Sequence, residues 1–325
     1  MSRYFLFIWL VVVSFAGAAT FQEDFSGNPA DRDWKIFGDT NLFQWNAITQ
    51  NLAVTWDSSR TNSYFYYSLK TILNRNDDFS FAFDLRMTEI IGGANPNKPS
   101  AFPLAIGFLN LKNALHTNFF RGTGLDSPNL VEFNFFPDTG FGPTIWPAIW
   151  ATNSSLNYNG SSDYTILDLP LGITARVALN YTASNRTLVT VITTNGISIG
   201  NIHPVSLSAN FTDFQVDAFA IESYSDFAQD PLFPGSILAH GIFDNLIINT
   251  PPPPVQNLRG FFSADQWQVE FLSRTNWIYG LERTENFQSW NNVSEKISGN
   301  GGQLILQDTN TSLLNAHFYR VKAER

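Results

Sequence analysis

Hydrophobic and polar residues alternate with a period of two along much of residues 20–250. In Asp78–Met87 every second residue from Phe79 onward is large and apolar, and the residues between them are small or polar. A strand places successive side chains on opposite faces, so this pattern predicts a strand with one buried face. Similar patterns predict strands at Trp34–Phe37, Leu52–Trp56, Tyr64–Leu69, Leu104–Leu109, Leu130–Phe136, Ala175–Tyr181, Leu188–Thr193, Phe214–Ile221 and Ile237–Ile248.

Turn-forming residues separate these segments, as in Gly92–Pro99 and Asp226–Pro234. No segment shows a sustained apolar period of 3.6 residues, which a helix on a core would require. Many strands with turns between them and no helix are typical of an all-β fold. The sequence therefore predicts a jelly-roll sandwich of two sheets packed face to face.

Four consecutive prolines, Pro251–Pro254, mark the clearest domain boundary. Prolines in series favour a stiff polyproline II spacer. We expect a first domain over 20–250, a linker over 251–255 and a small β-domain over 256–325. Strands of the small domain are predicted at Trp267–Leu272, Trp277–Glu282, Gln303–Gln307 and Phe318–Lys322, with a hairpin turn at Ser298–Gly302.

The small domain resembles the short β-modules that recur at the ends of exported bacterial proteins. The segments that carry the resemblance are WIYGLERTENFQSWNNVSEKI (277–297), LILQDTN (304–310) and FYRV (318–321). The resemblance implies an accessory or attachment module, and a cap that stabilises the first domain is the alternative.

Residues 1–19 have the pattern of a secretory signal peptide. Arg3 precedes the apolar run Tyr4–Phe15, and Ala16-Gly17-Ala18 offers a small-residue cleavage site. The run is too short for a membrane-spanning helix, and no other stretch of the sequence is long and apolar enough. We expect an exported protein, secreted or located in the periplasm or at the cell surface; an uncleaved anchor is the alternative.

Composition narrows the partner classes. The chain has no Cys, so after export its stability would rest on core size rather than on disulfides. The formal charge is −9, and the acidic and basic residues of 256–325 balance, so the acidic excess belongs to the first domain. Nucleic acid or an anionic membrane surface requires a basic patch, and we expect neither as a partner.

The strand Leu130–Phe136 carries the candidate chemistry of the first domain. Its alternation places Val131 and the phenylalanines at 133 and 135 on one face, and Glu132 and Asn134 on the other. Two oxygen-bearing side chains two residues apart on one face are close enough to serve one cation or one polar ligand. A third oxygen donor, Asp138, follows in the turn.

At these residues the chain resembles the concanavalin A-like sandwiches of legume-type lectins. Residues 131–138, VEFNFFPD, are similar to the metal-binding strand and turn of that family, which reads Val-Glu-Phe-Asp-Thr-Phe/Tyr-Pro-Asn. The flanking segments PLAIGFLNL (103–111) and ITARVALNYTASNRTLVTVITTNG (173–196) resemble the strands on either side of it. The resemblance implies a sugar-binding sandwich that carries metal ions.

The resemblance also implies roles for individual residues. Glu132 would bind a transition metal, Asn134 would stand where an Asp bridges that metal and calcium, and Phe136 (through its carbonyl) and Asp138 would bind calcium. Asn134 replaces the bridging Asp, a second Asp before Pro143 is missing, and no His follows in 144–153. A single Ca²⁺ remains open, because calcium accepts carbonyl and amide oxygens. In the alternative, Glu132 and Asn134 are polar groups satisfied by neighbours or water.

Aromatic residues among Asn, Ser and Gly mark a candidate sugar-binding segment at 140–164. Aromatic rings stack on the apolar faces of sugars while amides bond the hydroxyls. With Asn134, the candidate ligand-binding residues are therefore Phe141, Trp146, Trp150 and Tyr158. The alternative is that Trp146 and Trp150, which flank an apolar strand, belong to the core.

Motifs for catalysis are weak. Laminarinase-type glucanases share the sandwich and carry Glu-x-Asp-x-x-Glu or Glu-x-Asp-x-Glu on this strand, and retaining glycosidases need two carboxyl groups about 5 Å apart. Here Asn134, Phe136 and Pro137 follow Glu132, so the strand lacks the second carboxylate. It would have to come from a distant strand, for instance Asp84, Asp217 or Glu222.

Other catalytic arrangements have less support. The chain has no Gly-x-Ser-x-Gly, and its four His residues lack metal-ligand spacing. His240 is expected to make a structural hydrogen bond with Asp244 on the same strand.

The sequence thus predicts an exported, non-catalytic, lectin-like protein that binds a polysaccharide or other glycan. The alternatives are a structural or protein-binding surface module whose sugar site has decayed, and a glycoside hydrolase of the laminarinase type. The oligomeric state and the identity of the glycan are left open by the sequence.

Overall fold

The computed structural model describes residues 19–92, 103–116, 119, 129–139, 142–151, 159–226, 235–263, 266–309 and 317–325. The chain divides into two compact units, 19–251 and 252–325, and the division falls within the run of four prolines. The predicted signal peptide lies outside the described residues. Among those residues, no helix is long and apolar enough to cross a membrane.

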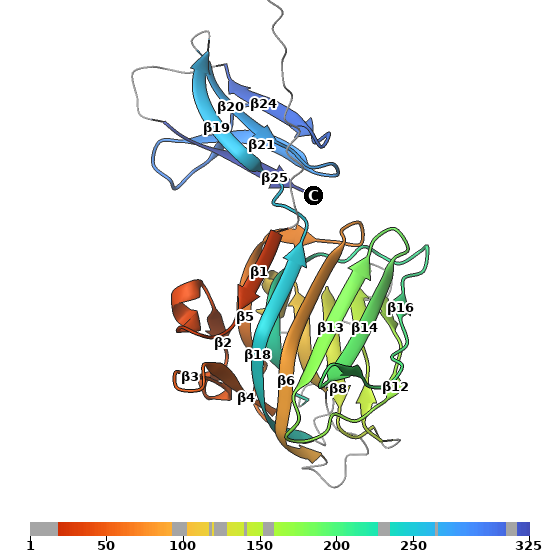
Figure 1. The fold of residues 1–325 in the computed structure, drawn as a ribbon. Helices are drawn as coiled ribbons and strands as arrows, with labels where there is room; N and C mark the ends of the chain where they lie inside the picture. Colours follow the sequence, from red (N-terminus) through yellow and green to blue (C-terminus); the bar gives the residue numbers. More distant parts are fainter. Residues whose placement is uncertain are drawn as a thin grey trace, which may run out of the picture. The chain divides into compact units, whose positions relative to one another are not determined.

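Two antiparallel sheets packed face to face form the first unit (Figure 1). Sheet A, nearer the viewer, has the order β15-β14-β13-β6-β18-β4-β3, with β1 beside β18 and β16 beside β14. Its strands are β1 (Ala19–Glu23), β3 (Phe43–Asn46), β4 (Asn51–Asp57), β6 (Phe79–Gly92), β13 (Ala175–Thr182), β14 (Thr187–Thr194), β15 (Ile197–Ser198), β16 (Val205–Ser206) and β18 (Ile237–Thr250).

Sheet B has the order β11-β10-β8-β7-β17-β5-β2, with β9 beside β8 and β12 beside β9. Its strands are β2 (Lys35–Phe37), β5 (Ser63–Leu73), β7 (Leu104–Leu109), β8 (Leu130–Phe136), β9 (Thr144–Ile145), β10 (Ala148–Ala151), β11 (Asn159–Ser162), β12 (Thr165–Ile166) and β17 (Val216–Ser223). The short helices are η1 (Pro29–Arg32), η2 (Thr40–Leu42) and α1 (Leu111–Ala114).

The apolar residues of the alternating strands fill the space between the sheets. In β6, Phe79, Phe81 and Phe83 are at most 3% exposed, whereas the residues between them are half-buried. Phe81 meets Phe108 and Phe219 of sheet B at ring-centroid distances of 4.9 and 5.6 Å, near the edge-to-face geometry that aromatic rings prefer. Truncating one such ring to Ala costs about 3–5 kcal/mol, so these contacts are a large part of what holds the sheets together.

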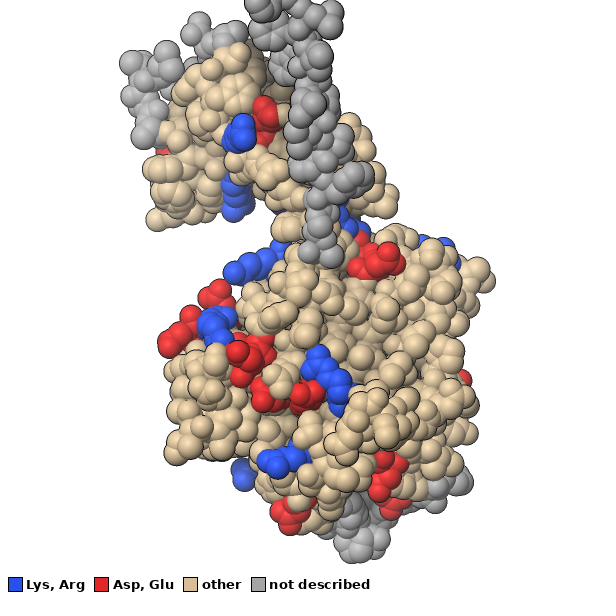
Figure 2. Space-filling model, viewed as in Figure 1, with Lys and Arg blue, Asp and Glu red and all other residues tan. Residues whose placement is uncertain are grey.

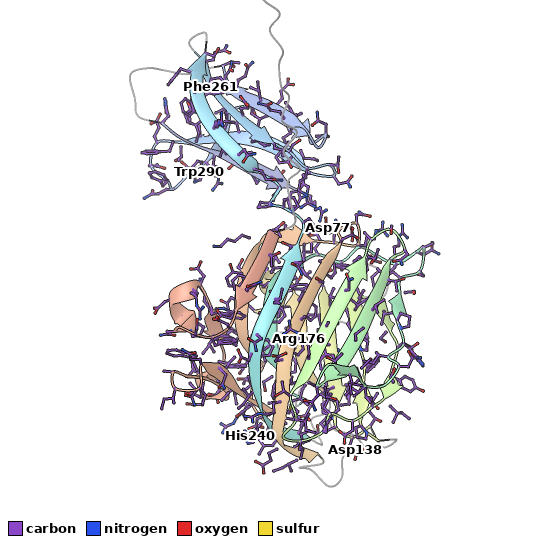
Figure 3. All side chains as sticks on the ribbon, viewed as in Figure 1. Asp77, Asp138, Arg176, His240, Phe261 and Trp290 are labelled. Atoms are coloured by element: carbon purple, nitrogen blue, oxygen red, sulfur yellow. The ribbon has the colours of Figure 1, made fainter. Side chains whose placement is uncertain are left out.

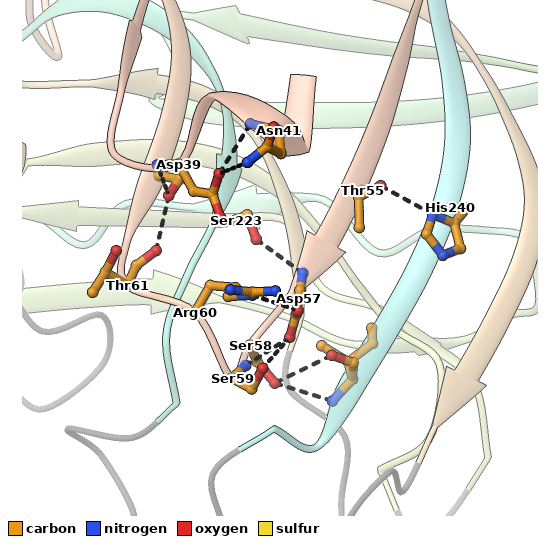
Figure 4. A network of polar contacts seen from close by, with 12 residues as sticks. Asp39, Asn41, Thr55, Asp57, Ser58, Ser59, Arg60, Thr61, Ser223 and His240 are labelled. Atoms are coloured by element: carbon orange, nitrogen blue, oxygen red, sulfur yellow. Dashed lines mark hydrogen bonds and ion pairs between the residues drawn. The ribbon is translucent and has the colours of Figure 1, made fainter. Parts of the chain in front are cut away.

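Polar contacts also join neighbouring strands and the two sheets (Figure 4). The backbone amide of Asp57 in β4 donates to Ser223 Oγ in β17 at 3.0 Å, which links sheet A to sheet B. His240 Nδ1 is 3.0 Å from Thr55 Oγ1 on the adjacent strand. Asp244 accepts instead from the next backbone amide. The predicted His240–Asp244 pair is therefore wrong, because register places Thr55 directly opposite His240.

Two small sheets form the second unit, one with the order β19-β20-β24 and one with β22-β21-β23 and β25 beside β21. The strands are β19 (Gln256–Ser263), β20 (Gln266–Leu272), β21 (Ile278–Thr284), β22 (Asn291–Asn292), β23 (Ile297–Ser298), β24 (Gln303–Asp308) and β25 (Phe318–Glu324). Its small core consists of residues at most 4% exposed: Val269, Phe271, Trp277, Tyr279, Leu281 and Leu306.

The predicted all-β sandwich followed by a small β-unit is confirmed. The strands at 104–109 and 130–136 have the predicted bounds, and most others extend by a few residues at one end or both. Several short strands were not predicted, namely β3, β9, β11, β12, β15, β16, β22 and β23, and neither were the longer strands β1 and β19. Most residues of β1 and β19 are at least partly exposed, so the sequences of these two strands carry no clean alternation between buried and exposed positions.

Candidate functional site

The face of sheet B that points away from sheet A carries several polar side chains that are buried in the first unit. In β8, Val131 and Phe133 point into the core, so Glu132 and Asn134 point to this opposite face. Asn134 pairs with Ala105 of β7, Ala105 pairs with Glu222 of β17, and Glu222 pairs with Tyr64 of β5. These four residues therefore form one row across the sheet, and their side chains share a face.

Tyr224, just after β17, completes this group of buried polar residues. Its hydroxyl donates to Glu132 Oε1 at 2.6 Å, a short hydrogen bond to a carboxylate. Tyr224 is 2% exposed, and the other members are fully buried. We refer to the group as the polar array: Tyr64, Glu132, Asn134, Glu222 and Tyr224.

The tyrosine and the two glutamates of the array influence one another electrostatically. Burial raises the pKa of Tyr64 well above its ordinary value of 10.0, and the negative charges of Glu222 and Glu132 raise this pKa further. The Tyr64 hydroxyl is therefore neutral at physiological pH. Tyr64 and Glu222 are direct partners on neighbouring strands.

Small residues separate the two glutamates of the array. Glu132 and Glu222 lie two strands and two residues apart, about 10 Å across the sheet and about 7 Å along it at the backbone. Between them lie Ala105 and Gly107 of β7, which leave the space above the sheet to longer side chains. A Cβ on Gly107 would lie 2.2 Å from the Val131 carbonyl oxygen, so this close strand approach requires glycine.

One edge of the array is open to solvent. Lys35 and Phe37 of β2 pair with Tyr66 and Tyr64 of β5, so all four side chains share the face of the array. Phe37 is 37% exposed and stacks on Tyr64 with ring centroids 5.5 Å apart and planes 13° apart. Tyr66 is half-buried, and Ser68 is exposed further along β5. We call this margin the open edge: Lys35, Phe37, Tyr66 and Ser68.

Phe119, in the connection between β7 and β8, covers the other side of the array. Its ring lies 6.3 Å from that of Tyr64 and 5.8 Å from that of Tyr224. Asn62 Nδ2 donates to the Phe119 carbonyl at 3.0 Å and fixes its position. The array is thus a covered polar interior that continues into an exposed aromatic edge.

The residues expected to bind metal have the following surroundings. Glu132 accepts from Tyr224, and Asn134 Nδ2 donates to the Trp146 carbonyl at 3.2 Å. Phe136 packs against the Trp146 ring at 5.3 Å, and Asp138 is exposed in the turn after β8. Within the described ranges, no three His, Cys, Asp or Glu side chains are grouped so that they could hold a metal ion. Calcium binding therefore stays a prediction of the sequence.

The predicted sugar-contacting aromatics fall in two groups. Phe141 and Tyr158 lie outside the described residues. Trp146 is half-buried against Phe136, and Trp150 in β10 is only 9% exposed and packs with the apolar core. Both tryptophans expose a smaller fraction of their surface than Phe37 does.

Of the three distant carboxylates considered from the sequence, only Glu222 reaches the face of Glu132. Asp84 lies on the outward face of sheet A and accepts from Arg176 Nη1 at 3.2 Å. Asp217 accepts from the Leu111 backbone amide at 2.8 Å. Four aromatic residues of this face were not among the candidates predicted from the sequence: Phe37, Tyr64, Tyr66 and Tyr224. The only signal available was the row of aromatics in Tyr64–Tyr67, which occupies both faces of its strand.

A polar groove of about 770 Å³ on the outward face of sheet A is the other concavity of note. Its charged side chains pair with one another, since Arg176 bonds Asp84 and Arg32 lies 2.7 Å from Glu23. Figure 3 shows Arg176 on this face. In Figure 2 the charged residues of the face gather toward β1 and β18, and the surface over β13 and β14 is largely uncharged. The groove lacks an aromatic side chain; its lining is Gln22, Glu23, Asp24, Ser26, Arg32, Asp84, Arg176, Thr193, Gly196, Asn245, Leu246 and Ile247.

Comparison with known proteins gives structural likeness only. No protein-family model and no curated protein matches the chain. Among solved structures, an endo-β-1,4-glucuronan lyase from the fungus Trichoderma reesei is 13% identical, with a TM-score of 0.42 and coverage of 71% of this chain and 94% of the lyase. Peanut lectin is 15% identical, with a TM-score of 0.39 and coverage of 72% and 99%. Alginate lyase Aly36B is 13% identical, with a TM-score of 0.34 and coverage of 70% and 96%.

The first unit is a sandwich of two nine-stranded antiparallel sheets packed face to face, as the sequence predicted. Proteins named as lectins and proteins named as lyases are both similar to it. A fold does not by itself fix a function, so the activity of this chain has to be argued from its own residues.

Proposed function

We propose that the first unit binds carbohydrate on the face of sheet B that carries the polar array and the open edge. One observation carries the proposal: the exposed ring of Phe37 and the half-buried ring of Tyr66 adjoin buried carboxylate, amide and phenol groups on one face. Aromatic rings stack on the C–H faces of a sugar, and the polar groups bond its hydroxyls.

The charge of the unit favours a neutral glycan. The chain has a formal charge of −9, and Lys35 is the single cation of the open edge. An anionic polysaccharide would meet Glu132 and Glu222 with few counter-charges, and like charges in a partly buried site repel. The expected substrate class is a neutral polysaccharide or oligosaccharide.

The test is thermal melting of the purified protein with a panel of neutral and anionic polysaccharides. A ligand that binds the native state alone stabilises it by RT ln(1 + [L]/Kd), so a hundredfold excess over Kd contributes about 2.7 kcal/mol. The variant Tyr66→Ala in the open edge should lose the shift. The matched control is Tyr164→Ala, which removes a 64% exposed tyrosine near the opposite edge of sheet B and should keep it.

A second candidate is cleavage of the polysaccharide, and one observation favours it. Glu132 and Glu222 share a face, and both influence the neutral hydroxyl of Tyr64, so groups able to donate and accept protons adjoin the proposed binding surface. Cleavage would release new chain ends from a bound glycan, and Glu222→Gln should abolish their release while the melting shift persists. A shift without new chain ends supports binding alone. If the protein shows no melting shift and releases no new chain ends, the first unit is a structural or protein-binding module.

A further inference from the structure

The second unit exposes a cluster of aromatic rings that its own fold leaves partly uncovered. Phe287 is 60% exposed and Phe318 is 42% exposed, and their ring centroids lie 4.1 Å apart. Trp290 is half-buried, 6.2 Å from Phe287, and the guanidinium of Arg320 lies 4.1 Å above its ring. Figure 3 shows Trp290 at the margin of this unit. We call this cluster the aromatic patch: Phe287, Trp290, Phe318 and Arg320.

The turn after β21 holds Phe287 in a conformation that disfavours it. Its φ is +60°, in the left-handed region that Gly and Asn adopt readily and bulky residues rarely do. Thr284 Oγ1 accepts from the Phe287 amide at 3.0 Å, and Asn286 Oδ1 accepts from the Gln288 amide at 2.9 Å. The turn therefore fixes the residue while its ring remains in solvent.

Neither local folding nor core packing accounts for a phenylalanine at position 287. Asn or Gly would relieve the backbone strain, and a polar residue would avoid the exposed apolar surface. Residues in strained backbone conformations are concentrated at active sites, ligand clamps and switch regions. The ring of Phe287 is thus best explained by a ligand that covers it.

The chemistry around the patch favours an uncharged, hydroxyl-rich ligand. Charged neighbours are already paired: Arg320 Nε donates to Glu282 Oε2 at 2.7 Å, and His317 Nε2 lies 3.1 Å from Glu285 Oε1. Such pairing leaves little charge to attract nucleic acid or an anionic membrane. Uncharged side chains with amide or hydroxyl groups surround the rings in sequence: Gln288, Ser289, Asn291 and Asn292.

We propose that the aromatic patch is a carbohydrate-binding site of the second unit, with Phe287 as its main stacking platform. The ring stacks on the C–H face of a neutral sugar, Phe318 supports that ring from behind, and the neighbouring amides bond hydroxyls. This site has its own residues and does not depend on the polar array of the first unit.

The experiment measures depletion of the full-length protein from solution by insoluble neutral polysaccharides, with cellulose, chitin and a β-1,3-glucan as probes. All variants carry Tyr66→Ala so that the first unit contributes as little as possible. Replacing Phe287 by Asn removes the ring and suits the left-handed backbone, so the melting temperature should be equal or higher. Binding should weaken about tenfold, the effect of one lost stacking contact. The control Leu258→Asn removes another exposed apolar side chain, 51% exposed in β19, and should bind normally.

Three results would overturn the proposal. They are equal binding by the Phe287→Asn variant, equal loss by Leu258→Asn, and binding to none of the three probes. A protein partner is the competing occupant. If sedimentation shows a self-association that Phe287→Asn abolishes while polysaccharide binding stays intact, the patch is a contact between copies of the chain. The melting test first shows, for each polysaccharide, whether Tyr66→Ala removes binding by the first unit. Depletion is compared only with polysaccharides for which the Tyr66→Ala protein shows no residual melting shift from the first unit, so the two proposals fail separately.

Discussion

The hydrogen bond between Tyr224 and Glu132 should be a main stabilising contact of the polar array. Tyr224→Phe removes one hydroxyl and keeps the ring, which packs 5.8 Å from both Tyr64 and Phe119. Both partners are almost fully buried, and the oxygen atoms are 2.6 Å apart. Removing the donor takes this partner from one carboxylate oxygen of Glu132, a side chain that is fully buried.

The magnitude follows from that burial. Hydrogen bonds to charged groups contribute about 1.5–3 kcal/mol, and a buried acceptor that loses its donor costs a similar amount. In a unit of this size 1 kcal/mol lowers the melting temperature by about 2–4 °C, so Tyr224→Phe should lower it by about 3–12 °C. Differential scanning calorimetry with urea unfolding as a second measure gives the change in the free energy of unfolding.

Tyr181→Phe is the matched control for this prediction. Tyr181 is also fully buried, but its hydroxyl donates to the neutral carbonyl of Arg75 at 2.9 Å. A neutral bond of this kind contributes about 1 kcal/mol. If Tyr224→Phe destabilises no more than Tyr181→Phe, the reasoning about the carboxylate is refuted.

Two further predictions concern the framework of the first unit. Gly107→Ala should lower the free energy of unfolding by about 3 kcal/mol or prevent folding, since the new Cβ would lie 2.2 Å from the Val131 oxygen and 2.8 Å from the Glu132 Cα. The control Gly27→Ala should be tolerated, because the nearest atom to its Cβ would be 3.9 Å away. The midpoints of urea unfolding compare the two variants. Burial raises the pKa of Glu23 above its ordinary value of 4.5, so ionisation of this carboxyl group costs more in the folded state than in the unfolded state. The contribution of Glu23 to the free energy of unfolding should therefore fall as the pH rises above about 4.5. The melting-temperature advantage of the natural protein over Glu23→Gln should therefore shrink from pH 4.5 upward, and an advantage that grows with pH would contradict the shifted pKa.

Local pattern predicted those parts of the fold in which one face of a strand is buried and the other is not. The alternation in β8 placed Glu132 and Asn134 on one face, and the structure confirms this separation from Val131 and Phe133. It could not show that Glu222 shares their face. That depends on the register of β17 against β7 and of β7 against β8, which long-range pairing sets.

The aromatic residues of the two sites were missed for similar reasons. In β5 the aromatics occupy both faces, so alternation does not say that Tyr64 and Tyr66 point to the array while Phe65 points to the core. In the second unit, Phe287 and Phe318 are far apart in sequence and meet because β21 pairs with β25. The positive φ of Phe287 could not be predicted, because no sequence pattern indicates that a phenylalanine adopts the left-handed conformation.

The two units place costly groups in opposite locations. The first buries carboxylates, where desolvation is expensive, and the second exposes aromatic rings, where contact with water is unfavourable. In the array the desolvation cost of Glu132 is partly offset by the hydrogen bond from Tyr224. The stability of the fold is a sufficient reason for that hydrogen bond, so it requires no ligand. At Phe287 the fold provides no such compensation, because the backbone is strained and the ring is exposed. The case for a ligand is therefore stronger at the aromatic patch than at the array, and the exposed Phe37 at the open edge is the feature of the first unit that most resembles it.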